Sequence, residues 1–407
     1  MNNKPLQSKT HSVRIHRGNR GFAMPLMLCA VVIMLVMGVG VLSFGQHSRR
    51  LAVSTSSGIA ARCAADTGLT QALYEMNKKV KVLPWNNSSL PELIDELLLN
   101  TDATYSYAVT GDLSSGHFVE STGEYGLEEK TVRCSLPLQG LFEYAIFGDE
   151  YVELKNGATV DWYNYDFDDK NLQIGTNSII AESVVLKDWA TVNGDVVVGV
   201  DGNPDTVIIN TGATVTGRTY AMTVEQELPL ITVPSWLESL PSGGTINDNI
   251  TISSSAKYDK IDLINSKIIT IDGEVSLYII GDIILKNSAE LQVVNGDDIS
   301  LTLYVGGNIE VKNSGVINNL NTDPKKLKIY GLDGCKSIYL KNGSDFYGAI
   351  YAPNADVVMM NSGETFGAII GKSFEQKNSA AFNYDASLRD VNIDDEGIHF
   401  VITNWSE

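Results

Sequence analysis

The sequence predicts a mainly β protein carried on one long N-terminal α-helix. Residues 22–44 are apolar and uncharged, and apolar residues three or four apart continue a helical pattern to about residue 80. From about residue 144 onward, short Val/Ile-rich runs recur between Asn, Asp, Gly and Ser, which is typical of a repetitive β domain. Residues 81–143 then form a small α+β neck between the two parts.

The apolar stretch 22–44 is long enough to cross a bilayer, because a helix needs about 20 apolar residues to do so. A cleaved secretory signal has a shorter apolar core of about 7–15 residues, so a membrane anchor is the simplest interpretation. The flanking basic residues predict a cytoplasmic N-terminus and an extracytoplasmic C-terminal part. Those before the stretch are Lys4, Lys9, Arg14, Arg17 and Arg20, and those after it are Arg49, Arg50 and Arg62.

The junction before this stretch resembles that of a type IV prepilin. A basic leader, residues 1–21, ends in Gly21 and is followed by Phe22 and the unbroken apolar helix. Residues 59–80 are similar to the helix of PilX-type minor pilins, in which small residues lead to an acidic residue, Gly-Leu and Ala-Leu. Here these positions are Ala64, Ala65, Asp66, Gly68, Leu69, Ala72 and Leu73. The resemblance covers roughly residues 14–80. It implies cleavage by prepilin peptidase between Gly21 and Phe22, methylation of Phe22 and packing of the helix inside a filament.

One position departs from the major pilins, which carry a glutamate at the fifth residue of the mature chain. Here that position is Leu26. A carboxylate buried in lipid is costly unless it is paired. Its absence fits a subunit at a filament tip, and it equally fits an ordinary membrane anchor.

The charge is divided unevenly along the chain. The first 65 residues hold eight basic and no acidic groups, so the remainder holds 30 − 8 = 22 basic and 49 acidic groups. Nucleic-acid binding needs Lys- and Arg-rich surfaces, so the acidic remainder argues against that function.

The four cysteines predict at most one disulfide outside the membrane. Cys29 lies in the apolar stretch and is interpreted as a small apolar filler. Cys63, Cys134 and Cys335 lie outside it, and the pair Cys63–Cys134 is the predicted bridge because both precede the repeat domain. No Cys/His cluster indicates a metal.

In the neck, residues 90–99 predict a short helix. The segments TYSYAVTG, HFVESTGEYG and KTVRCSLPL alternate apolar and polar residues, which predicts a small antiparallel sheet.

A short unit recurs through residues 144–390: apolar-x-apolar, a polar pair, two small residues and another apolar residue. Asn tolerates a left-handed backbone and Gly or Ser lets a tight corner close. Stacking such units buries their apolar side chains in a common interior. The sequence therefore predicts a single-stranded parallel β-helix, right-handed by the resemblance. The units start at Val152, Val184, Val207, Ile283, Ile309, Ile338, Val357 and Phe374.

Residues 221–249 contain prolines 229, 234 and 241 and are expected to run outside the β-helix, because proline cannot donate to a strand ladder. A similar Pro-rich insertion is usual in PilX-type proteins with this kind of ectodomain. Residues 382–390, FNYDASLRD, resemble the closing segment of that domain of unknown function. Residues 391–407 are expected to form a last strand, a terminal cap or a tail.

The sequence contains no catalytic motif, and we expect no enzyme activity and no cofactor. Weak calcium candidates are Asp166, Asp168, Asp169, Asp201 and Asp205, although solvated acidic turns explain them more simply. A lysine recurs at one position of the unit, at Lys155, Lys187, Lys286, Lys312, Lys341 and Lys377. These lysines are expected to line one edge, where they would prevent edge-on aggregation or contact an anionic glycan.

The predicted function is that of a minor-pilin-like structural subunit in the bacterial inner membrane, whose β-helix head serves assembly, priming or adhesion. The expected partners are other pilins, the pilus assembly machinery, prepilin peptidase and a surface glycan or host ligand. The alternative is a membrane-anchored β-helix that binds or cleaves polysaccharide.

Overall fold

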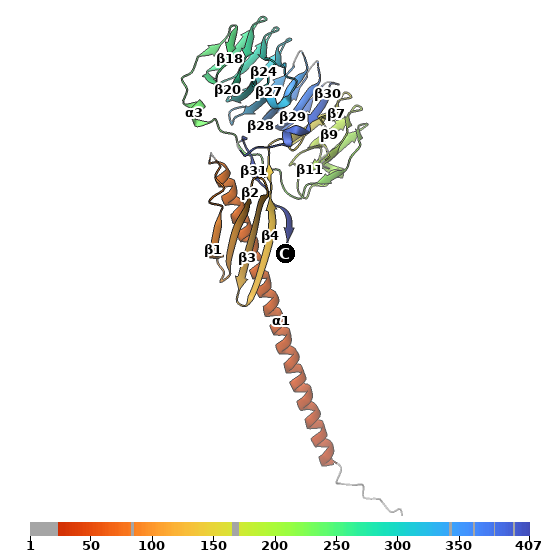
Figure 1. The fold of residues 1–407 in the computed structure, drawn as a ribbon. Helices are drawn as coiled ribbons and strands as arrows, with labels where there is room; N and C mark the ends of the chain where they lie inside the picture. The colour runs from red at the N-terminus through yellow and green to blue at the C-terminus, as the bar shows by residue number, and fades with distance from the viewer. Residues whose placement is uncertain are drawn as a thin grey trace, which may run out of the picture.

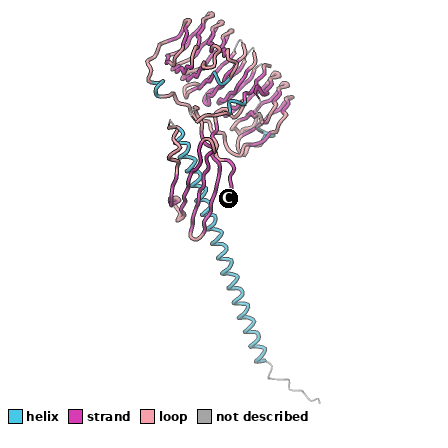
Figure 2. Tube along the Cα trace, viewed as in Figure 1, coloured by secondary structure: helices cyan, strands magenta, loops and turns pink. Residues whose placement is uncertain are grey.

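The computed structural model describes residues 23–82, 85–164, 171–341, 344–360, 363–377, 379–393 and 395–407. A long helix leads into a small sheet, and a stack of short parallel strands lies beyond that sheet (Figure 1). Strand dominates the chain beyond the helix (Figure 2). The predicted fold class, mainly β with an N-terminal apolar helix and parallel β-helix-like sheets, is confirmed.

Helix α1, Ala23–Val80, is continuous over 58 residues. The described side chains of its first half are exposed, and its second half packs against strands β2, β3 and β4 of the neck. The buried face of the second half carries Leu69, Ala72, Met76 and Val80, whose spacing of three or four residues is that of one helix stripe. The part of the helix that was predicted to continue to residue 80 therefore packs on the neck sheet through this stripe.

The neck sheet is antiparallel and has the order β1-β2-β3-β4-β32. Its strands are β1 Glu92–Leu97, β2 Thr104–Asp112, β3 Gly116–Tyr125, β4 Glu128–Leu136 and β32 Thr403–Ser406. The helix predicted at residues 90–99 is wrong, because this segment pairs along β2 as strand β1. Its Leu/acidic pattern fits either structure. Pairing with the free edge of β2 decides for the strand, with an irregularity at Asp95, whose φ is 53°.

Residues 391–407, predicted as a last strand, a cap or a tail, return to the neck as two short strands. Strand β31, His399–Phe400, pairs with β5, Leu138–Gln139, and β32 pairs with β4. The Asn77 side chain on α1 donates to the Phe400 carbonyl (3.1 Å) and accepts from the Phe400 amide (2.6 Å). The last residues therefore tie α1 to the sheet and do not cover the end of the β-helix.

The solenoid, strands β6 to β30, has three faces of parallel strands. The first face holds β15 Thr245–Ile246, β18 Lys260–Ile264, β21 Ile283–Lys286, β24 Ile309–Lys312, β27 Ser337–Leu340, β9 Val184–Lys187 and β12 Ile208–Thr211. The second face holds β16 Ile250–Ile252, β19 Ile268–Ile271, β22 Glu290–Val293, β25 Val316–Asn319, β30 Ala381–Asp385, β7 Thr159–Asn164, β10 Thr191–Val192 and β13 Thr214–Val215. The third face holds β17 Ala256–Tyr258, β20 Glu274–Ile279, β23 Ser300–Val305, β26 Leu327–Gly331, β8 Gln173–Gly175, β11 Asp195–Val198 and β14 Thr219–Ala221. The longer strands β6 Ile146–Leu154, β28 Phe346–Met359 and β29 Thr365–Gln376 pass from one face to another.

The corner between the first and second faces is formed by the Asn of the repeated unit and the small residue that follows it. Asn287 and Ser288 have φ of 55° and 65°, and Asn313 and Ser314 have φ of 51° and 63°. Left-handed backbone costs little at Asn, so these residues turn the chain without the strain that a β-branched residue would suffer there. The predicted left-handed corner is confirmed.

The coils do not stack in chain order. Along the first face the register runs Ile261, Ile283, Ile309, Ile338, Val357, Phe374, Val152, Val184, Ile208. The chain therefore enters the solenoid in its middle, builds outward to β14, and crosses to the far end through a connector, residues 222–244. It then builds back until β29 and β30 meet β6 and β7 (Figure 1).

Two short helices and two 3-10 turns interrupt the strands: α2 Pro204–Val207, α3 Ser235–Glu238, η1 Pro324–Lys326 and η2 Ala386–Arg389. The unit predicted to start at Val207 is one residue out of register, because Ile208 pairs with Val184 and Val207 ends α2. The connector contains α3 and the three prolines, as expected of a segment outside the strand ladder.

Candidate functional site

The free half of α1 exposes apolar side chains on every side. Met24 is 80% exposed, Leu26 67% and Phe44 81%, and the glycines at 38, 40 and 45 face open space. The helix is long and apolar enough to cross a membrane, and its most apolar stretch has no residue buried inside the protein. A helix that is apolar all round is stable only in lipid or among other apolar helices. Gly21 and Phe22, the predicted processing site, lie outside the described residues.

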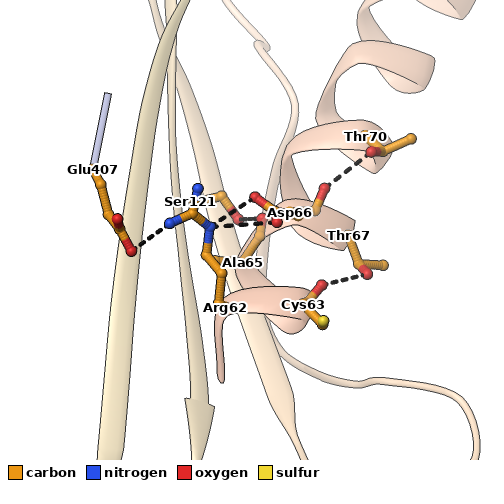
Figure 3. A network of polar contacts seen from close by, with 8 residues as sticks. All are labelled: Arg62, Cys63, Ala65, Asp66, Thr67, Thr70, Ser121 and Glu407. Carbon is orange, nitrogen blue, oxygen red and sulfur yellow. Dashed lines mark hydrogen bonds and ion pairs between the residues drawn. The ribbon is translucent and has the colours of Figure 1, made fainter. Parts of the chain in front are cut away.

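The other half of α1 approaches the neck sheet closely because its contact face is made of small residues. Ala61, Ala64 and Ala65 are fully buried. A Cβ on Gly123 of β3 would lie 2.1 Å from the Ala61 carbonyl oxygen and 2.4 Å from the Ala65 nitrogen. A Cβ on Gly68 would lie 2.3 Å from Ser121 Oγ, which itself donates to the Ala65 carbonyl at 2.7 Å (Figure 3). The small residues of the pilin-like motif thus make the helix–sheet contact.

Polar contacts at the edge of this interface join α1 to the C-terminal residue of the chain (Figure 3). Arg62 on α1 donates to Asp66 at 3.2 Å, pairs with Glu407 and lies over the Trp405 ring at 4.2 Å. The hydrogen bond from Arg62 lowers the pKa of Glu407 below its ordinary value. Asp66, the acidic residue of the motif, therefore takes part in the neck's own structure.

The predicted disulfide between Cys63 and Cys134 is absent from the structure, in which both thiols are free. Cys63 lies on the exposed side of α1, whereas Cys134 is buried under the helix and burial raises its pKa to about 11. Helical periodicity separates them, since Ala61, Ala64 and Ala65 occupy the face toward the sheet.

Five of the six recurring lysines lie beside glutamates on the outside of the first face. Glu153 pairs with Lys155 and Lys187 at 2.8 Å, and Glu375 pairs with Lys377 at 2.8 Å. Glu310 accepts from Lys286 at 2.7 Å and from Lys312, and these two bonds lower its pKa. These lysines are therefore neutralised within the ladder, which favours the protective role over contact with an anionic glycan.

The outside of the third face is apolar and covered, a feature that the sequence analysis missed. Tyr304, Tyr330 and Tyr351 occupy one outward row and are 3%, 2% and 0% exposed. Tyr351 donates to the Pro229 carbonyl of the connector (2.8 Å), and Tyr304 donates to Glu396 of the returning chain (2.9 Å). The neck and the connector thus dock on this face, and the repeated aromatic spacing was its sequence signal.

A polar cavity of about 370 Å³ brings together two distant arginines, Arg218 and Arg389. Arg389 donates to the Glu143 carbonyl at 3.2 Å and to the Asn171 carbonyl at 3.1 Å, so it holds the entry and exit of the solenoid together. Asp195 is 1% exposed and accepts from the Arg218 amide at 2.7 Å. Arg218 itself is largely exposed at the rim.

The structure assembles no metal site from the calcium candidates that it describes. Asp201 before α2 and Asp205 in its first turn are both exposed, and the Asn203 side chain caps α2 by accepting from the Asp205 amide at 3.1 Å. Within the described ranges, no group of three His, Cys, Asp or Glu residues could hold a metal ion. Asp166, Asp168 and Asp169 lie outside the described residues.

Comparison with known proteins gives one family and a distant structural likeness. Residues 242–391 match a family described as "Domain of unknown function (DUF7305)", which covers the part of the solenoid after the connector and includes residues 382–390. No curated protein matches. A solved structure, the competence-associated pilin ComZ from Thermus thermophilus, is 12% identical, with 86% of this chain and 97% of that chain covered at a TM-score of 0.23. A TM-score this low does not define a shared fold.

Proposed function

We propose that this chain is a minor-pilin-like subunit of a type IV pilus or related pseudopilus, and that its solenoid is displayed outside the membrane. The observation that carries the proposal is the division of α1. One half is apolar and exposed on all sides, and the other half is packed on a sheet through a face of small residues. Such a helix can exchange lipid for neighbouring helices while its head stays folded and outside.

The first test concerns the N-terminus. Prepilin peptidase is expected to cleave between Gly21 and Phe22 and leave a methylated Phe22, which mass spectrometry of the protein from its native host would detect. A Gly21→Leu variant is the matched control and should keep the leader. An intact leader on the wild-type chain, in cells that possess the peptidase, would overturn the proposal.

The second test concerns assembly. The wild-type protein should co-purify with sheared surface filaments or with their assembly machinery, whereas the uncleaved Gly21→Leu variant should stay in the membrane fraction. Wild-type protein found only in the membrane fraction, while the major filament subunit is sheared normally, would indicate a plain membrane anchor.

A tip position, with a priming or adhesive role, is the finer part of the proposal. Because Leu26 is uncharged, it needs no charged partner in the subunit ahead of it. A subunit at the tip, which has no subunit ahead of it, therefore loses no interaction. The second face of the solenoid is the side that could meet a ligand, because the third face is covered and the first carries the lysine–glutamate ladder. Labelled protein seen along filament shafts, and not at their ends, would argue against the tip.

The cavity around Arg218 favours a second candidate, binding or cleavage of polysaccharide. It combines an exposed arginine with the buried carboxylate of Asp195, groups that carboxylate-based sugar chemistry uses. The full-length chain in detergent should then release reducing ends from a susceptible glycan, and Asp195→Asn should abolish the release. Binding to a glycan array without any release would restrict this candidate to adhesion.

A further inference from the structure

The β3–β4 hairpin is the part of the neck nearest the membrane-spanning half of α1. Ser54 on α1 donates to Glu128 at the end of this hairpin at 2.8 Å. The open cleft between hairpin and helix is lined by residues from Gln46 to Ser57 and by Gly126, Leu127 and Glu128. The hairpin tip is therefore fixed beside the first polar turns that follow the apolar stretch.

The tip carries a large apolar side chain without any cover. Leu127 is 104% exposed, next to Gly126 in a left-handed turn with φ of 65°. Tight turns usually carry small or polar residues, so a leucine here gains nothing inside the protein. Because the tip lies beside the apolar half of α1, the membrane that would surround that half is the apolar environment available to Leu127.

The cleft below this tip reaches down to the edge of a bilayer. With a rise of about 1.5 Å per residue, Arg49 lies about 8 Å and Ser54 about 15 Å beyond Phe44 along the helix axis. The headgroup region is about 5–8 Å thick on each side of the hydrocarbon core. The lower part of the cleft, between Gln46 and Arg50, thus lies at headgroup level. The tip stands just above this level, and a helix tilt of about 20° toward the hairpin would bring Leu127 down to the headgroups.

We propose that the hairpin tip is a membrane foot: Leu127 inserts among the lipid headgroups while Arg49 and Arg50 bind the phosphates of anionic phospholipids in the outward leaflet. The arginines line the same cleft as Leu127. Their positive charge offsets Glu128 and Glu129 of the hairpin, which an anionic surface would otherwise repel. The proposal rests on the membrane insertion of α1 in the proposed function, and it describes the subunit before assembly.

Site-directed spin labelling of the full-length chain in vesicles tests the foot. The background is Cys29→Ala with Cys63→Ser, because Cys134 and Cys335 are buried at 3% and 0% exposure and will not take the label. One nitroxide is placed at Leu127→Cys. The matched control is Leu113→Cys, which is also exposed but lies in the β2–β3 hairpin at the opposite end of β3.

We expect the ratio of relaxation by oxygen to relaxation by a water-soluble nickel complex to be several-fold higher for the label at position 127 than for the label at position 113. This difference should be larger in vesicles containing phosphatidylglycerol than in pure phosphatidylcholine. Arg49→Gln with Arg50→Gln should remove that lipid dependence. Equal water accessibility at the two positions, or a lipid dependence that survives loss of both arginines, would overturn the foot.

Contact with a second copy of the chain is the rival outcome. In that case the label at position 127 would be better protected from the nickel complex at higher protein density in the vesicles, and two copies of the Leu127→Cys variant would form disulfide cross-links. These two results together would identify a neighbouring subunit, and not lipid, as the partner of Leu127. The test is independent of processing and filaments. An immersed label on a chain that is never cleaved at Gly21 would refute the pilin assignment alone, and a cleaved, filament-bound chain with a water-exposed label would refute the foot alone.

Discussion

Gly123 is the position at which the helix–sheet contact can be tested most directly. In an open strand, Gly→Ala normally stabilises by reducing the freedom of the unfolded chain, by about 0.4–1 kcal/mol. At Gly123 the added Cβ would lie 2.1 Å from the Ala61 carbonyl oxygen, 2.4 Å from the Ala65 nitrogen and 2.9 Å from the Ala64 Cβ. Two of these atoms belong to the backbone of α1, so no side-chain rotation relieves the clash, and the helix must move away from the sheet.

Overpacking of this kind costs about 1–3 kcal/mol. A loss of about 2 kcal/mol raises the open population of the neck roughly thirty-fold. Hydrogen exchange of the β3 amides, followed by mass spectrometry on the detergent-solubilised full-length chain, would register the change as correspondingly faster exchange. The strands of the solenoid should keep their rates, since the three atoms nearest the added Cβ all belong to α1.

Gly58→Ala is the matched control, because Gly58 lies on α1 with nothing within 4 Å of the added Cβ. This change should leave exchange in β3 unaltered or slow it, since alanine favours the helix by about 1 kcal/mol. If β3 in Gly123→Ala exchanges as slowly as in the wild type, the close approach of α1 to the sheet does not exist in solution.

Three further predictions concern other parts of the chain. A maleimide should label Cys63 rapidly in the native protein and leave Cys134 unlabelled until unfolding, and resistance of both thiols that reductant abolishes would restore the disulfide. Asn313→Val should lower the melting temperature of the solenoid while Asn313→Gly leaves it nearly unchanged, because φ is 51° at this corner and left-handed backbone costs a branched residue about 1–2 kcal/mol; equal effects would show that the corner geometry is wrong. Burial raises the pKa of Glu396, so the folded state binds the proton more tightly than the unfolded state, and the stability of the junction should fall as pH rises from below the ordinary glutamate pKa through the raised one. Glu396→Gln should remove that slope in unfolding experiments across this pH range, and an unchanged slope would assign it to another group.

Several features follow from the sequence because they depend on neighbours in the chain. The uncharged run 22–44 is long enough for a bilayer, and the spacing of apolar residues to Val80 defines a helix face before any sheet is known. The Asn-Ser corners were predictable for the same reason, since a residue that tolerates positive φ marks the turn in which it sits. The repeated unit therefore predicted the parallel β-helix.

Other features depend on which surfaces meet, and the sequence does not encode that locally. Every coil presents a similar apolar interior, so a coil can stack on a distant coil as readily as on the next one in the chain. The coil of Phe374 accordingly stacks on the coil of Val152. The order was decided by the connector's reach across the third face and by the return of residues 399–406 to the neck. The segment at Glu92–Leu97 became a strand because β2 offered it a free edge, and Cys63 missed Cys134 because the close helix–sheet contact turned it toward solvent. Local propensity determined most elements of this protein, and burial against distant partners determined their order, their pairing and the strand at Glu92–Leu97.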